Sequence, residues 1–265
     1  MTASVAPVDR PAYRLTPLTV LLLAGAALAW AGVIAYAVDM GNGPGTMALS
    51  LGEFLAMWGG MMTAMMLPAV APVASLYSRT MTTNRMRHLA LFIAGYLVVW
   101  TAAGLPTYLV LRWVDDVAGE ANTTMRVIAE VILVAAGVYQ LSPIKSRCLR
   151  HCRSPLAQLL HYGNVKGPAR DLRVALHHAA FCLGCCWALM ALFVAFGVMN
   201  VWVMLALAAI VVSEKVLPRG EVLGRLAGGV FLLLALLVFA SPSVADALVP
   251  SMNADSNGPM MQMDG

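Results

Sequence analysis

Three cysteines lie close together in the stretch HAAFCLGCCWALMALF at 178–193, which is apolar enough to cross a membrane. In a helix, four of its candidate ligands fall on one narrow stripe or its flank, because residues three and four apart share a face. Thiolates and imidazoles are the ligands that copper and zinc ions prefer. The pattern predicts a buried soft-metal site that is approached through a histidine pair. Its candidate ligands are His177, His178, Cys182, Cys185 and Cys186.

A second group of soft ligands is the sequence CLRHC at 148–152. Cys148, His151 and Cys152 are spaced i, i+3 and i+4, so they share one face if the preceding helix continues through them. Such a ligand set suits zinc or copper. An alternative is that this is a basic juxtamembrane segment whose arginines bind anionic lipids, and both interpretations can hold together.

Methionines are concentrated in MWGGMMTAMMLP at 57–68. A helix would align Met57, Met61 and Met65 in one ridge, with Met62 and Met66 in a second ridge beside it. The thioether is a soft ligand suited to Cu(I), although methionine is also an adaptable filler of cores. Further methionines stand in the polar C-terminal stretch, where they cannot serve as core. They are Met252, Met260, Met261 and Met263.

Acidic residues inside apolar stretches are candidates for function, because a charge inside the hydrocarbon is costly. Glu53 and Glu130 each stand several residues inside a predicted span, and the alternative is that they reach the outer interface. Glu214 and Lys215 end another span, where we expect them to pair with each other or with a neighbouring helix.

The elements that position these groups are membrane-spanning helices. Of the 265 residues 60% are hydrophobic and only 11% are charged, and the mean hydropathy is +0.79. Such a composition excludes an ordinary soluble protein, which carries about 25% charged residues. The fold class is therefore all-α, a polytopic bundle of about seven transmembrane helices. The predicted spans are 17–38, 47–76, 88–112, 124–142, 174–197, 198–216 and 223–240.

Charge alternates between the loops in a way that fits seven spans. Of the 17 Lys and Arg residues, all except Arg112 and Arg126 fall in the N-terminal segment or in every second loop. The positive-inside rule then places the N-terminus in the cytoplasm and the C-terminus outside. The predicted organisation is a cytoplasmic segment 1–16, a helix bundle 17–240 with a cytoplasmic loop 143–173, and an external Met-rich tail 241–265.

Four motifs in the same order resemble a known bacterial family. They are WGGMMTAMMLP, YQLSPIKSRCLRHCRSP, GCCWALM and SEKVLP, and they span roughly residues 50–220. The chain resembles the domain-of-unknown-function 2182 family, described as predicted metal-binding integral membrane proteins. The resemblance implies metal binding and a place in the bacterial inner membrane. The functional residues that it implies are Met61, Met62, Met65, Met66, Cys148, Cys152, Cys185 and Cys186.

The leading hypothesis is a non-enzymatic membrane protein that handles Cu(I), by transport or by delivery to a membrane copper enzyme. Zinc is the alternative metal. Expected partners are membrane lipids and a copper enzyme or copper chaperone, and not nucleic acid. One rival is a thiol-disulfide conduit that uses Cys182 and Cys185, since C-x-x-C is a spacing of redox pairs. Another is a non-catalytic accessory subunit of a membrane complex.

Overall fold

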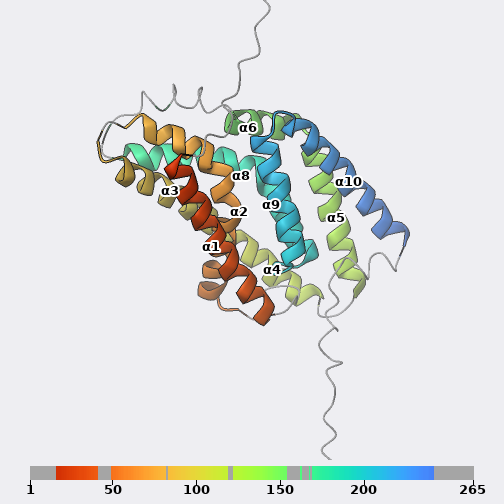
Figure 1. The fold of residues 1–265 in the computed structure, drawn as a ribbon. Helices are drawn as coiled ribbons and strands as arrows, with labels where there is room; N and C mark the ends of the chain where they lie inside the picture. Colours follow the sequence, from red (N-terminus) through yellow and green to blue (C-terminus); the bar gives the residue numbers. More distant parts are fainter. Residues whose placement is uncertain are drawn as a thin grey trace, which may run out of the picture.

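The described part of the chain is built of α-helices, as predicted. The structure is a computed structural model, and it describes residues 16–40, 49–81, 83–118, 122–153, 162, 167 and 169–241. No strand occurs among these residues. Figure 1 shows the helices gathered into one bundle. They are α1 (Pro17–Met40), α2 (Leu51–Arg79), α3 (Arg85–Ala102), α4 (Gly104–Ala118), α5 (Asn122–Leu141), α6 (Pro143–Arg153), α8 (Arg170–Phe196), α9 (Val201–Val216) and α10 (Gly220–Ala240).

Six helices in the described residues are long and apolar enough to cross a membrane. Each corresponds to one of the seven predicted spans. They are Pro17–Val38, Leu51–Arg79, Arg85–Asp116, Thr124–Leu141, Arg170–Phe196 and Gly220–Ala240. The seventh predicted span is α9, which has 16 residues and reaches only about 24 Å at 1.5 Å per residue. That α9 crosses the membrane stays a prediction.

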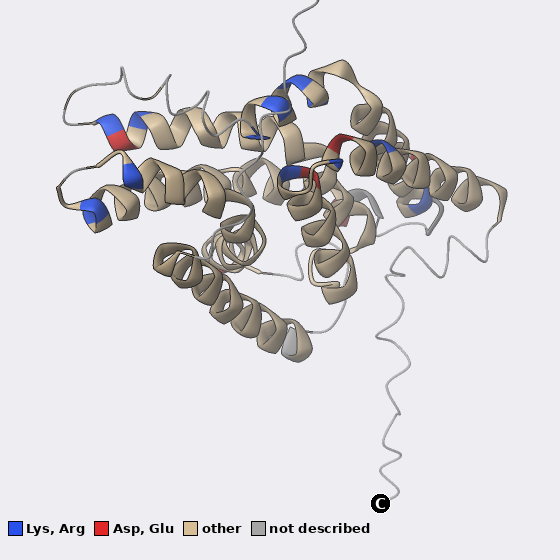
Figure 2. Cartoon of the chain, turned by 45° about the horizontal axis from the view of Figure 1, so that its top comes forward, with Lys and Arg blue, Asp and Glu red and all other residues tan. Residues whose placement is uncertain are grey.

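The side chains on the outside of the bundle also fit a surrounding of lipid. Leu28 is 75% exposed, Phe239 is 71% exposed and Trp202 is 81% exposed. Large apolar patches on a surface mark contact with another apolar phase. In Figure 2 the Lys and Arg residues gather toward one side of the molecule, while long stretches of helix carry no charge.

Helix α2 lies in the middle of the bundle and contacts α1, α3, α4 and α9. Pro68 and Pro72 stand inside this helix, where each removes one backbone hydrogen bond. The helix changes direction along its length in Figure 1, which is the usual consequence of internal prolines. Most of its length is buried, so its methionines face other helices and not lipid.

The third predicted span is divided at Ala103 into α3 and α4. Pro106 lies in the first turn of α4, where the missing N–H does least harm, and its ring disfavours continuation of the preceding helix. Gly104 begins α4 at a close approach to α2, since an added Cβ would lie 2.8 Å from Cδ1 of Trp58. The break therefore lets α4 turn while it keeps contact with α2.

The fourth predicted helix does not continue through CLRHC. Helix α5 ends at Leu141, and α6 starts at Pro143 as a separate helix that packs against α8. The proline cannot donate the backbone hydrogen bond that would continue α5. The segment predicted as the loop 143–173 thus opens with a helix, which carries Cys148, His151 and Cys152 to α8.

Candidate metal centre

Four cysteine side chains lie buried where α6 meets α8. Cys182, Cys185 and Cys186 come from α8, and Cys152 comes from α6. The Sγ atom of Cys185 lies 3.4 Å from Sγ of Cys186 and 4.0 Å from Sγ of Cys152. Two sulfurs bound to one ion by bonds of about 2.3 Å can be up to about 4.6 Å apart. Both sulfur pairs are therefore within reach of a single ion, and all the cysteines are free thiols.

The fourth sulfur of this group, Cys182, has different neighbours. The Nζ atom of Lys215 donates a hydrogen bond to Sγ of Cys182 over 2.8 Å. The hydroxyl of Tyr96 lies 2.9 Å from the same sulfur. The thiol of Cys185 donates a hydrogen bond to the backbone carbonyl oxygen of Cys182 over 3.2 Å. One cation and one hydroxyl, from α9 and α3, thus meet at Cys182.

Gly184 allows α6 to approach α8 at the cysteine cluster. An added Cβ on Gly184 would lie 3.2 Å from Sγ of Cys148, a tighter contact than side chains normally make. The hydroxyl of Tyr139, on α5, donates a hydrogen bond to the carbonyl oxygen of the same glycine. Cys148 therefore packs against the backbone of α8, beside the buried sulfurs.

The two predicted histidines at the start of the α8 stripe face different neighbours. The ring of His177 stands 5.3 Å from the ring of His151, and its Nδ1 lies 3.2 Å from the Tyr162 hydroxyl. His151 stacks on Phe181 with ring centroids 3.9 Å apart. Burial, with a smaller contribution from Cys152, raises the pKa of the Tyr162 phenol above its ordinary value.

His178 lies deep between α3 and α8 and is 2% exposed. Its ring neighbours are Phe92 and Tyr96, and it stands one turn before Cys182 on the same face of α8. Its Nδ1 atom has no hydrogen-bond partner among the described residues. A buried polar atom without a partner costs free energy, so this nitrogen is available to a ligand.

Glu214 and Lys215 do not pair with each other, and each contacts a different neighbour. The Glu214 carboxylate lies 2.7 Å from Nζ of Lys145 and accepts a hydrogen bond of 2.9 Å from Gln140. Lys145 also donates to the side-chain carbonyl oxygen of Gln140. Because consecutive helix residues point about 100° apart, Lys215 faces α8 instead. The sequence marked this pair as notable but could not assign either partner.

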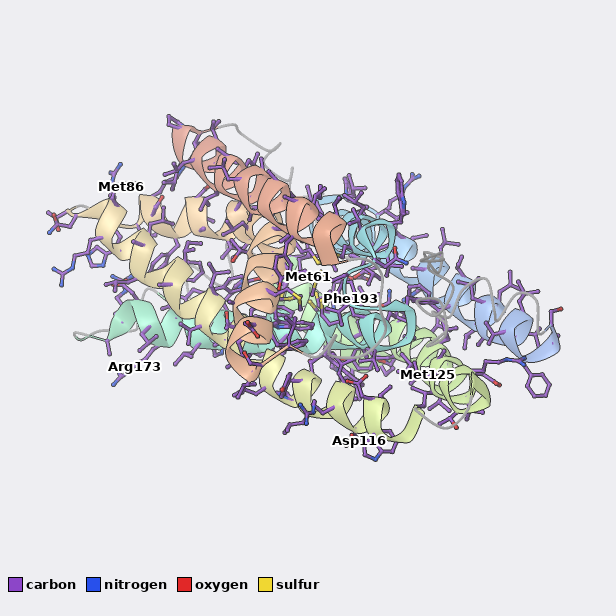
Figure 3. The ribbon with its side chains drawn as sticks, turned by 90° about the horizontal axis from the view of Figure 1, so that it is seen from below. Met61, Met86, Asp116, Met125, Arg173 and Phe193 are labelled. Atoms are coloured by element: carbon purple, nitrogen blue, oxygen red, sulfur yellow. The ribbon has the colours of Figure 1, made fainter. Side chains whose placement is uncertain are left out.

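The predicted methionines lie in the core of the bundle. Met61, Met62, Met65 and Met66 are fully buried, and Met57 is 9% exposed. Figure 3 labels Met61 and Phe193 near the middle of the molecule, with sulfur atoms drawn beside them. Helix α2 touches α8 within this stretch through the rings of Trp58 and Phe193, and beyond it through a hydrogen bond from Tyr77 to Asp171.

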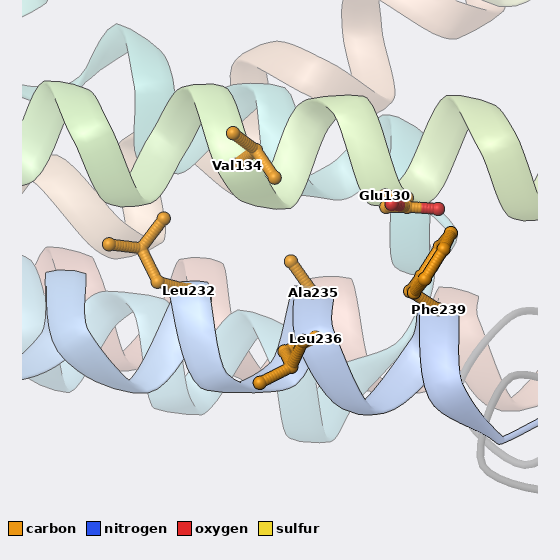
Figure 4. A pocket seen from close by; sticks show the side chains of 6 residues that line it. All are labelled: Glu130, Val134, Leu232, Ala235, Leu236 and Phe239. Carbon is orange, nitrogen blue, oxygen red and sulfur yellow. The ribbon is translucent and has the colours of Figure 1, made fainter.

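The two acids predicted inside spans lie in unlike places. Helix α2 begins at Leu51, so Glu53 is in its first turn and exposed, where it forms a capping box with Ser50. Glu130 is half-buried on α5 and faces α10 across a pocket of about 320 Å³. Figure 4 shows its carboxylate beside Phe239 at one end of this pocket. Neither acid is close to the cysteines by any contact that we find in the described residues.

No group of three or more His, Cys, Asp or Glu side chains in the described residues is already arranged around a metal position. The closest approaches between the sulfurs are those of Cys185 to Cys186 and to Cys152. The methionines of the tail, Met252, Met260, Met261 and Met263, lie outside the described residues, as does His161.

A model of the family described as "PpoB2: Copper chaperone" matches residues 55–238, which is more than half of the chain. The matched range contains the buried methionines, the α6 cysteines, the α8 cysteines and Lys215. This supports a copper-related family, under a different name from the family that the sequence motifs resemble. No curated protein and no solved structure matches the chain.

Proposed function

The chain belongs to the PpoB2 copper chaperone family, and on this premise we propose that it binds Cu(I) at the cysteine cluster between α6 and α8. The observation that carries the proposal is the set of short sulfur distances around Cys185, with Cys186 at 3.4 Å and Cys152 at 4.0 Å. Thiolates are soft ligands that suit Cu(I). The role is one of holding and passing on the ion, without catalysis.

The buried methionines of α2 are the second part of the proposal. Four of them are fully buried in α2, which meets α8 at the rings of Trp58 and Phe193. We propose that they form a thioether path that hands Cu(I) to or from the thiols, since weaker ligands next to stronger ones let an ion move between them. The proposed location is a bacterial inner membrane, with the N-terminus in the cytoplasm and the Met-rich tail outside. The tail would collect copper there.

Copper binding and transfer can be measured directly. Purified protein in lipid nanodiscs should take Cu(I) from a chromophoric chelator under anaerobic conditions, and Cys185→Ser should lose most of this binding. The pair of changes Met61→Leu and Met65→Leu keeps apolar volume and should slow transfer to an acceptor chelator without unfolding the protein. Met125→Leu, at a buried methionine of α5, is the matched control.

Several results would count against the proposal. A wild-type protein that takes no Cu(I) from the chelator would refute copper binding. Equal transfer rates for the α2 pair and for Met125→Leu would refute the methionine path alone.

The proposed topology is tested by reporter fusions. Fusions after Gly45, Asp116 and Ser241 should report the outside, and fusions after Thr82, Gly167 and Gly220 should report the cytoplasm.

A thiol-disulfide conduit is the second candidate function. The sulfurs of Cys152 and Cys185 are close enough for a small movement to join them, which favours reversible oxidation between α6 and α8. The pair differs from the C-x-x-C pair predicted from the sequence.

A further inference from the structure

Lys215 carries a positive charge into the cysteine cluster. Its Nζ lies 2.8 Å from Sγ of Cys182, and among the described residues it forms no ion pair with a carboxylate. The hydroxyl of Tyr96 lies on the same sulfur, 2.9 Å from Sγ of Cys182. The ammonium group therefore faces sulfur on the side of the proposed copper site.

The direction in which the Lys215 side chain points is determined by Glu214, the residue before it. Glu214 is held by Lys145 and Gln140, and α10 closes on this carboxylate at Gly224, where an added Cβ would lie 2.8 Å from Oε1 of Glu214. With Glu214 held toward α5, α6 and α10, the next residue of α9 must point toward α8. The buried ion pair thus orients Lys215 on Cys182.

We propose that Lys215 is a specificity-determining residue, whose fixed charge makes the cysteine cluster select monovalent Cu(I) over divalent metal ions such as Zn(II). The proposal rests on Cu(I) binding at this cluster. Thiolates alone do not discriminate well, since both ions accept them. What differs between the two ions is one unit of charge.

Charge balance gives the direction of the selection. Cu(I) with two thiolates has a net charge of −1, which the ammonium of Lys215 neutralises. Zn(II) with the same two thiolates is already neutral, so the ammonium leaves a partly buried positive charge without a partner. For any fixed set of thiolates, a divalent ion places one more positive charge beside Lys215, and this repulsion is strong where water is excluded.

The test compares Lys215→Gln with Lys215→Arg in the full-length protein. Dissociation constants for Cu(I) and Zn(II) are measured by competition with chromophoric chelators, and Co(II) thiolate absorption reports the divalent site independently. We expect Lys215→Gln to improve Zn(II) binding relative to Cu(I) by about tenfold or more, because it removes the charge. Lys215→Arg should keep the wild-type ratio. Arg219→Gln, which removes an exposed charge beyond the end of α9, should also leave the ratio unchanged.

The ratio of the two affinities separates selectivity from structure. If Lys215→Gln weakens both metals in parallel, Lys215 only supports the fold and the proposal is overturned. A ratio that changes as much in Lys215→Arg as in Lys215→Gln would overturn it too, since the charge is then irrelevant. If the wild type binds no Cu(I), the proposed function itself fails, and that result is distinct from an unchanged ratio in a copper-binding protein.

Discussion

The Sγ atoms of Cys152 and Cys185 lie 4.0 Å apart, although 33 residues separate these cysteines in the chain. One belongs to α6 and the other to α8, so the pair exists only because α6 folds back on α8 after Pro143. The proposed copper site is therefore an interhelical site, and changes that separate the two helices should act on it.

The first prediction concerns which cysteines hold copper. Cys152→Ser and Cys185→Ser should each weaken Cu(I) binding more than about tenfold, because the serine oxygen is a hard ligand. Cys148→Ser should have a smaller effect, since that sulfur packs against the backbone of Gly184. Chelator competition measures all three, and equal losses would show that the site extends to Cys148.

The second prediction concerns oxidation. Mild oxidation of the copper-free protein should join Cys152 to Cys185, because no other sulfur contact links α6 to α8 in the described residues at a comparable distance. Peptide mapping by mass spectrometry identifies the bond, and prior loading with Cu(I) should protect the thiols. A bond between Cys152 and Cys185 that forms just as readily with copper present would instead favour the thiol-disulfide conduit.

A third prediction follows from the glycine at the helix contact. Gly184→Ala should lower Cu(I) affinity, since its Cβ would meet Sγ of Cys148 at 3.2 Å and push α6 away from α8. Gly229→Ala in α10 is the control, because a Cβ there meets nothing within 4 Å. The control should leave copper binding intact and stabilise the helix by about 0.5–1 kcal/mol. Identical copper affinity in both variants would disprove the role of this close approach.

The fourth prediction concerns stability. Glu214→Gln leaves the buried Lys145 ammonium without its carboxylate, and we expect a loss of about 3–5 kcal/mol in the free energy of unfolding. Glu53→Gln should cost less than about 0.5 kcal/mol, because Gln can still complete a capping box at an exposed helix start. Thermal unfolding in nanodiscs compares the two. If Glu214→Gln unfolds at the same temperature as the wild type, the ion pair does not stabilise the position of α9, and packing alone holds this helix.

The helices of this protein could be predicted from the sequence, because a long apolar run is a local signal that needs no partner to interpret. The same holds for the ligands within α8, where His178, Cys182, Cys185 and Cys186 share a face by their spacing alone. The predicted end of the span 124–142 agrees with the end of α5 at Leu141, next to the helix-breaking Pro143, whereas the separate helix α6 in the predicted loop was not predicted. Glu53 was placed too deep, because an apolar run does not mark where the N-cap falls, and Ser50 supplies it.

Only the tertiary structure decided which of these ligands meet across helices. The pairing of Cys152 with Cys185 depends on the fold of α6 against α8, and the contact of Lys215 with Cys182 depends on how α9 is turned about its axis. From the sequence, Glu214 and Lys215 were expected to pair with each other or with a neighbouring helix. The helix directs the two side chains to different neighbours, because adjacent residues differ by about 100° around its axis and the buried carboxylate of Glu214 is paired with Lys145.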